Sequence, residues 1–274
     1  MIHNLDGIDV IYWINLDRAK DRYRHMEKNV LNDDMFKNKK VERIKAIDYK
    51  DNNLDKYFKV DFNYKTSNTE FACLASHLET IRTFSETDYQ TALIFEDDVS
   101  LDYKKYWTKS IQELIHNAPK DWEILKLCIW PYMNFKSEYT FWKPECKYKN
   151  GKFENNADWG CIAYIINRKA AKKLMNKLYI DNKYDLSNSI AIVADYLLYT
   201  YLRTYTYKYE YFPSKKNNNT YIQLDSCKDK NKKYLNELKT RNQIIKKREI
   251  VLKTIQSKTV QYKTIKNRTR KYKK

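Results

Sequence analysis

The stretch Thr91-Ala92-Leu93-Ile94-Phe95-Glu96-Asp97-Asp98-Val99-Ser100 joins a short apolar run to three consecutive acidic residues. The apolar run has the length and composition of a buried β-strand. Three adjacent carboxylates at a strand end repel one another and lose solvation, a cost that a bound cation or basic partners usually offset. In open α/β sheets, ligands bind at the carboxyl ends of strands, and these acids lie at such an end.

Two interpretations of the acidic triplet are open. Glu96 and Asp98, two residues apart, can point to one side of the chain and share Mn²⁺ or Mg²⁺, hard ions that prefer oxygen ligands and commonly bridge a diphosphate. Alternatively, the acids form a solvated turn that caps a helix beginning near Asp102. The first interpretation predicts metal ligands at Glu96 and Asp98 and leaves Asp97 for a ribose or a basic neighbour.

Strands and helices are expected to alternate on both sides of this stretch. Apolar, β-rich runs predict further strands at residues 10–16, 41–47, 123–127, 161–166 and 207–212. Helical spacing of apolar residues predicts helices at residues 17–30 (with Asp17 as N-cap), 69–85, 106–117, 168–178 and 190–202. The Trp/Tyr/Lys-rich stretch 129–156 is expected to be irregular. This alternation predicts an α/β fold with a mixed, mostly parallel sheet flanked by helices.

Composition excludes several classes of protein. The chain has 274 residues, of which 42% are hydrophobic, so it can bury a core and is not disordered. It contains 3 glycines, and neither G-x-G-x-x-G nor a Walker A motif occurs. Any nucleotide must therefore be held by side chains, a metal ion and helix ends.

The net charge of +18 is concentrated at the C-terminus. Residues 228–274 hold 18 basic and 3 acidic residues, whereas residues 1–227 carry a net charge of only +3. We therefore expect a catalytic domain at 1–227 and a basic, partly helical tail at 228–274. A near-neutral body argues against specific nucleic-acid binding. The tail could dock on the domain, mediate self-association or bind an anionic membrane surface.

The cysteines and the N-terminus indicate a cytoplasmic-type protein. The five cysteines are widely spaced without a C-x-x-C pair, so we expect reduced thiols and no zinc site. The first nine residues lack the apolar core of a signal peptide, and no apolar run approaches the length of a membrane span. The expected location is cytoplasmic, either soluble or peripherally membrane-associated.

Four segments, in this order, resemble glycosyltransferase family 25, which includes lipooligosaccharide and collagen hydroxylysine galactosyltransferases. They are Ile14-Asn15-Leu16-Asp17-Arg18 with Arg22 behind it, Phe71-Ala72-Cys73-Leu74-Ala75-Ser76-His77-Leu78, Phe95-Glu96-Asp97-Asp98-Val99 and Cys161-Ile162-Ala163-Tyr164-Ile165-Ile166-Asn167-Arg168-Lys169-Ala170. A weaker match is Ile192-Val193-Ala194-Asp195, and together the matches span roughly residues 8–213.

The resemblance implies a GT-A-like single domain and an inverting mechanism that uses a UDP-sugar, usually UDP-galactose. The sequence departs from the family pattern in places: Ala72 stands where glycine is usual, and Ala194 replaces valine or proline. In many GT-A enzymes a late histidine completes the metal site, but the last histidine here is His116. The third metal ligand therefore has no candidate.

The candidate donor-binding residues come from three regions. The first is the end of the first strand and the following helix, where Arg18 and Arg22 could meet a diphosphate or could be solvated helix charges. The second is the end of the second strand, where base and ribose contacts usually fall. The third is the helix at 69–85, where His77 is either a core histidine or, by the family match, part of the donor pocket. The candidates are Asn15, Leu16, Arg18, Arg22, Ala46, Asp48, Ser76, His77 and Asp97.

Two aspartates are candidates for the catalytic base. Asp195 lies among apolar residues, so it is either a buried cap or a base with a raised pKa. Asp158 is the alternative, because its neighbour Trp159 could stack on a sugar ring.

The leading hypothesis is a metal-dependent, inverting hexosyltransferase. It would move galactose or glucose from a UDP-hexose to a hydroxyl of a glycan or of hydroxylysine in a collagen-like protein. The alternative is a catalytically inactive transferase-like scaffold, or a basic protein that binds anions or nucleic acid.

Overall fold

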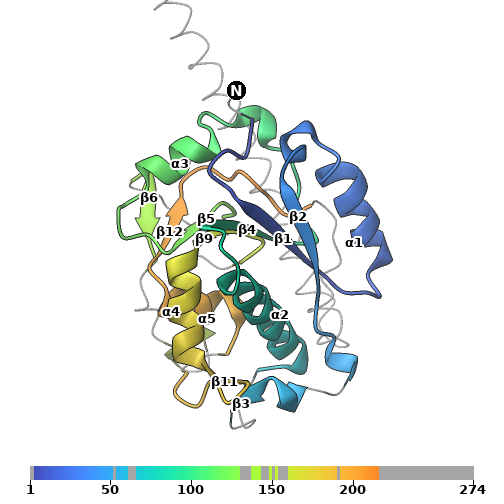
Figure 1. The fold of residues 1–274 in the computed structure, drawn as a ribbon, viewed down its shortest axis with the longest axis vertical. Coiled ribbons are helices and arrows are strands. Elements are labelled where there is room, and N and C mark those ends of the chain that lie inside the picture. The colour runs from blue at the N-terminus through green and yellow to red at the C-terminus, as the bar shows by residue number, and fades with distance from the viewer. Residues whose placement is uncertain are drawn as a thin grey trace, which may run out of the picture.

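Seven strands form the central sheet of the computed structural model (Figure 1). Their order is β2 (Lys40–Lys45), β1 (Val10–Asn15), β4 (Thr91–Glu96), β9 (Ala163–Asn167), β5 (Ile124–Lys126), β12 (Thr204–Tyr207) and β6 (Tyr139–Phe141). All are parallel except β9 and β6, which run antiparallel to their neighbours. The structure describes residues 3–51, 54–60, 66–129, 137–142, 148–149, 152–153, 160–189 and 192–215. The expected mixed, mostly parallel α/β sheet is confirmed.

The two central parallel strands bring the acidic triplet beside the end of the first strand. β1 is buried along its whole length, and β4 is buried except at its two ends. Their register pairs Val10 with Ala92 and Ile14 with Glu96. Asn15 and the acidic residues therefore leave the sheet at the same edge.

Three helices cover one face of the sheet: α2 (Asn68–Ser85), α4 (Arg168–Leu178) and α5 (Ala194–Tyr201) (Figure 1). Tyr12 and Ile94 point into this layer and share a buried apolar cluster with the three helices. A capping box, in which Ser67 and Glu70 exchange side-chain and backbone hydrogen bonds, fixes the start of α2. The predicted helices at 69–85 and 168–178 are confirmed.

The other face is covered by α1 (Lys20–His25), which continues as a π-helical turn at Met26–Val30, and by α3 (Ile111–Asn117). Trp13 and Phe95 point into this second layer, where Phe212 packs edge-on against Phe95. Side chains alternate between the two faces along each strand, so the sheet separates two apolar clusters.

Smaller elements surround the sheet. A three-stranded sheet consists of β10 (Tyr179–Ile180), β11 (Lys183–Asp185) and β3 (Phe58–Lys59), and β7 (Tyr148–Lys149) pairs with β8 (Lys152–Phe153). Short 3-10 turns occur at Asp34–Phe36, Tyr49–Asp51, Leu54–Lys56 and Lys104–Tyr106. No helix in the described part of the chain combines the length and apolarity needed to cross a bilayer.

The expectation that Asp17 caps a helix is wrong. α1 begins at Lys20 after Ala19, which makes no side-chain capping hydrogen bond. Asp17 instead pairs with Arg43 at 2.6 Å and Lys45 at 2.9 Å, both on β2. Two cations from the neighbouring strand outweigh the local preference of aspartate for an N-cap.

Three further boundaries differ from expectation. The stretch expected to be irregular contains β6, which pairs with β12. The strand expected at 207–212 lies earlier, at Thr204–Tyr207, and Tyr211 and Phe212 leave the sheet to fill the core. α3 begins at Ile111 rather than at residue 106, because Ser110 forms its capping box with Glu113. The proposed boundary at 227/228 and the basic tail lie outside the described residues and stay a prediction.

Candidate functional site

The ends of β1 and β4 meet at a buried hydrogen bond. Asn15 is 1% exposed, and its Nδ2 donates to Oδ2 of Asp97 at 2.6 Å. The adjacent parallel register of the two strands makes this contact possible. Two polar side chains, 82 positions apart in the chain, are thus joined at one edge of the sheet.

Arg22 connects α1 to the acidic triplet. Its Nη1 lies 2.6 Å from Oδ1 of Asp97, and its Nη2 lies 4.0 Å from Oδ2 of Asp98. Burial raises the pKa of Asp97, against the lowering effects of Arg22 and Asn15. The sequence left Asp97 for a ribose or a basic neighbour; the structure places Arg22 against it, and a ribose contact stays a prediction.

Arg43 on β2 extends the network, although it was not among the residues expected from the sequence. Its Nη2 donates to Oδ1 of Asn15 at 2.9 Å and to Asp17 at 2.6 Å. Its guanidinium also lies 5.9 Å from the ring centroid of Trp13 and 5.3 Å from that of Tyr23. An arginine in a strand next to a strand-end asparagine is a weak signal, because the contact depends on the β1–β2 register.

The segment after β2 is tied to the loop between β1 and α1 and to α2. Arg18 Nε lies 2.5 Å from Oδ2 of Asp48. The Ile47 amide donates to Oγ of Ser76 at 2.9 Å, and this hydroxyl donates to the Ala72 carbonyl at 2.7 Å. Of the other predicted residues, Ala46 donates its amide to the Asn15 carbonyl, whereas Leu16 packs against the apolar cluster under α2.

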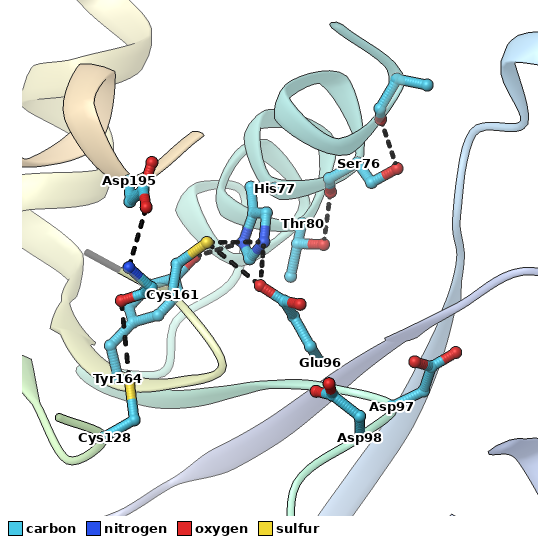
Figure 2. A network of polar contacts seen from close by, with 12 residues as sticks. Ser76, His77, Thr80, Glu96, Asp97, Asp98, Cys128, Cys161, Tyr164 and Asp195 are labelled. Carbon is cyan, nitrogen blue, oxygen red and sulfur yellow. Dashed lines mark hydrogen bonds and ion pairs between the residues drawn. The ribbon is translucent and has the colours of Figure 1, made fainter. Parts of the chain in front are cut away.

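Glu96 points toward His77 on α2 and toward Cys161 (Figure 2). Its Oε1 lies 3.4 Å from Nε2 of His77 and accepts from the Cys161 thiol at 3.1 Å. Burial acts to raise the pKa of Glu96, but the hydrogen bond and charge of His77, the Cys161 thiol and the charge of Arg22 outweigh burial and lower it. His77 is thus part of a polar cluster rather than of an apolar face.

Asp98 is buried beside the segment that follows β12. Its Oδ2 accepts from Oγ of Ser214 at 3.3 Å, and its carbonyl accepts from the Lys215 amide at 2.7 Å. Val99 and Ser214 form an antiparallel bridge that holds this segment against the triplet. Ser214 was not a sequence candidate, because nothing local to residue 214 indicates a return to β4.

Asp195 is the second residue of α5. Its Oδ2 accepts from the Gly160 amide at 2.8 Å, and Oδ1 accepts from the amide of Tyr196 at 3.0 Å. Burial raises the pKa of Asp195, whereas the Gly160 and Tyr196 amides and the charge of Lys126 lower it. The alternative base, Asp158, lies outside the described residues.

The structure therefore divides the predicted residues into groups. Asn15, Arg22 and Asp97 form one group, with Asp98 at its edge. Glu96 and His77 form another on the α2 side, to which the structure adds Cys161 and Cys73. Neither the shared Glu96–Asp98 metal site nor the roles of the donor residues are tested by this geometry, and they stay predictions.

A seven-stranded, mostly parallel sheet flanked by helices, with acidic residues at the end of a central strand, fits a GT-A-like glycosyltransferase fold. The family model for glycosyltransferase family 25 (LPS biosynthesis protein) matches residues 8–187. The chain therefore belongs to glycosyltransferase family 25. No curated protein matches it. The matched span includes the whole acidic triplet but ends before Asp195 and Ser214.

Proposed function

We propose that this glycosyltransferase is an inverting, metal-dependent hexosyltransferase that uses a UDP-sugar. The donor hexose would be galactose or glucose, and the acceptor a hydroxyl of a glycan or of hydroxylysine in a collagen-like protein. The family's description as LPS biosynthesis proteins favours the glycan. The observation that carries the proposal is the acidic triplet at the end of β4, with Arg22 against it.

The residues at the triplet fit a hard divalent cation. Asp98 is buried, and the hydroxyl oxygen of Ser214 lies beside its carboxylate. Oxygen donors suit Mn²⁺ or Mg²⁺. Asp98, with Glu96, would hold the ion, which would act as a Lewis acid on the leaving diphosphate.

The remaining groups supply binding and proton transfer. Arg22 and Arg18, which pair with Asp97 and Asp48, would offer positive charge to the diphosphate, and Asp48 would accept a hydrogen bond from the ribose. Asp195 would take the proton of the acceptor hydroxyl while the oxygen of that hydroxyl attacks the anomeric carbon. The bond from that carbon to the diphosphate oxygen breaks, UDP leaves with the electron pair, and the configuration inverts.

The proposal is tested by UDP binding with and without a cation. Calorimetry should show tighter binding of UDP in Mn²⁺ than in EDTA. Asp98→Asn should lose Mn²⁺-dependent binding and reduce transfer by roughly 10²-fold or more, because the amide keeps the shape but removes the ligand charge. Asp102→Asn, at an exposed acid four residues further along, is the matched control and should behave like the wild type. Equal UDP affinity in both conditions, or full turnover by Asp98→Asn, would contradict the metal assignment.

A further inference from the structure

A second group of potential metal ligands lies between α2 and the strands. Three atoms form a triangle: Cys161 Sγ, His77 Nε2 and Glu96 Oε1 (Figure 2). Its sides are 3.3 Å from sulfur to nitrogen, 3.1 Å from sulfur to oxygen and 3.4 Å from nitrogen to oxygen. The proposed transferase chemistry uses neither Cys161 nor Cys73, the other cysteine of this region.

The size of the triangle matches one face of a tetrahedral zinc site. Zinc binds sulfur, nitrogen and oxygen at about 2.0–2.3 Å, which corresponds to ligand–ligand distances of roughly 3.3–3.8 Å in a tetrahedron. The observed sides are at or just below this range. Small outward shifts of the three side chains would therefore make room for the ion.

Cys73 is the candidate for a fourth donor, beside His77 and Glu96. It lies one helical turn before His77 in α2, and side chains four residues apart share a helix face. The ligand atoms of Cys73, His77 and Glu96 lie within 4.8 Å of one another. Cys73 and Glu96 are partly exposed, which leaves a route of entry, whereas His77 and Cys161 are buried.

The histidine is already held in a ligand orientation. Its Nδ1 lies 3.0 Å from the hydroxyl oxygen of Tyr164, so Nε2 is the ring nitrogen that faces the cluster. A metal-binding histidine commonly has its other ring nitrogen engaged in this way by a neighbour. Tyr164 thus acts as a positioning residue for His77.

We propose that Cys73, His77, Glu96 and Cys161 bind a zinc ion that joins α2 to the ends of β4 and β9. Two thiolates and an imidazole suit zinc better than Mn²⁺ or Mg²⁺. Four protein ligands define a structural rather than a catalytic site. The proposal departs from the expectation of no zinc site, which rested on the absence of a C-x-x-C pair, because the fold brings potential ligands together from positions 73, 77, 96 and 161.

Zinc binding would release protons. Burial raises the pKa of both the Cys73 and Cys161 thiols well above the usual range, which favours the protonated form of each thiol. Each thiol must lose its proton to bind the ion. Zinc affinity should therefore increase with pH, with protons appearing in solution on binding.

This inference does not rest on the proposed function. Glu96 is the one residue that the two proposed sites share. Asp98 is not a member of the cluster, and the cation proposed there is a hard ion with oxygen ligands. Variants at the ligands that are not shared, Asp98 on one side and Cys73 or Cys161 on the other, therefore distinguish the two ions. Asp98→Asn should leave zinc binding intact, and Cys73→Ser should weaken it at least tenfold.

The test uses the full-length chain, loaded with Zn²⁺, dialysed, and analysed by elemental mass spectrometry. The wild type should retain one equivalent of zinc, and replacement by Co²⁺ should give sulfur-to-cobalt charge-transfer absorption. Cys73→Ser and Cys161→Ser should each weaken zinc binding at least tenfold and remove or reduce this absorption. Cys128→Ser, at another buried thiol that is not in the cluster, is the matched control and should bind like the wild type.

Two results would overturn the proposal. One is a wild-type protein that retains no zinc and shows no sulfur-to-cobalt absorption, which would leave a hydrogen-bonded cluster only. The other is equal zinc affinity in the wild type, Cys73→Ser and Cys161→Ser, which would place the ion elsewhere in the chain. If Cys161→Ser fails to fold, Cys73→Ser at the partly exposed position decides the question.

Discussion

At the scale of single residues, the site is a chain of polar contacts with an arginine at each end. Arg43 contacts Asn15, Asn15 contacts Asp97, and Asp97 contacts Arg22. Because Asp97 is 6% exposed, its carboxylate depends on these partners rather than on water. A buried ion pair is costly to break, because removal of one partner leaves the other charge uncompensated.

Arg22→Ala should therefore destabilise the protein by about 3–5 kcal/mol. The measurement is the free energy of unfolding in urea. Arg203→Ala is the control, since Arg203 pairs with Asp121 and both side chains are about half exposed. It should cost less than about 1 kcal/mol. Similar losses for the two variants would show that the Arg22–Asp97 pair behaves as a surface pair.

The raised pKa of Asp195 predicts a pH dependence of stability. Its pKa in the folded protein exceeds the ordinary value of 3.8, so the folded state holds this proton to higher pH than the unfolded state. The free energy of unfolding then falls as pH rises through that window. The loss of stability caused by ionising Asp195 in the folded state is absent below the ordinary pKa and complete above the pKa in the folded protein.

Asp195→Asn should remove this dependence, because the amide does not titrate. The stability of the wild type relative to Asp195→Asn should decline from about pH 4 upward and then level off. Urea denaturation at several pH values measures the difference. Parallel pH profiles for the two proteins would show that Asp195 titrates as it does in water. If Asp195 is also the base, the variant should lose transfer activity at every pH.

At the scale of elements, α2 is linked to the segment that follows β2. Ser76 accepts from the Ile47 amide while it donates to the Ala72 carbonyl one turn earlier in its own helix. The hydroxyl thus satisfies a backbone group of another element, next to Asp48. This link places Asp48 relative to the helix that carries His77.

Ser76→Ala should cost about 1–3 kcal/mol, because the Ile47 amide loses its partner. Thr80→Val is the matched control: this hydroxyl is also buried in α2, but it donates within the helix to the Ser76 carbonyl at 2.7 Å. Loss of the Thr80 hydroxyl should cost less, since the Ser76 carbonyl keeps its hydrogen bond within the helix. Chemical denaturation measures both, and an equal or larger loss for Thr80→Val would contradict the linking role of Ser76.

At the scale of the whole molecule, charge and chemistry are separated along the chain. Every candidate catalytic residue lies in residues 1–227, whereas residues 228–274 carry +15 of the net charge of +18. The tail's attraction to anionic surfaces would be electrostatic and would weaken with salt.

A chain that ends near Asp225 should keep UDP binding and donor hydrolysis. It should lose salt-sensitive association with anionic vesicles, or its multimeric state, relative to the full-length protein. Vesicle sedimentation at low and high salt, together with mass measurement, tests this. A shortened protein that is folded by circular dichroism but does not bind UDP would contradict the division at 227/228, and unchanged vesicle binding and mass would contradict the role of the tail.

Local patterns determined which elements form. The apolar spacing at 168–178 predicts α4 with its observed bounds, and the run before Glu96 predicts β4. These predictions succeed because helix and strand periodicity are properties of neighbouring residues. Asp17 shows where local reasoning fails, since its ion pairs with Arg43 and Lys45 come from another strand.

The sequence by itself determined the family resemblance and the acidic triplet at a strand end. The tertiary structure decided where the three carboxylates point: Glu96 toward α2, Asp97 toward α1, and Asp98 toward Ser214. It also added Arg43, Ser214, Cys73 and Cys161 to the surroundings of the triplet. The physical reason is that strand register and helix packing bring these groups together across tens of residues, whereas sequence patterns report only on neighbours along the chain.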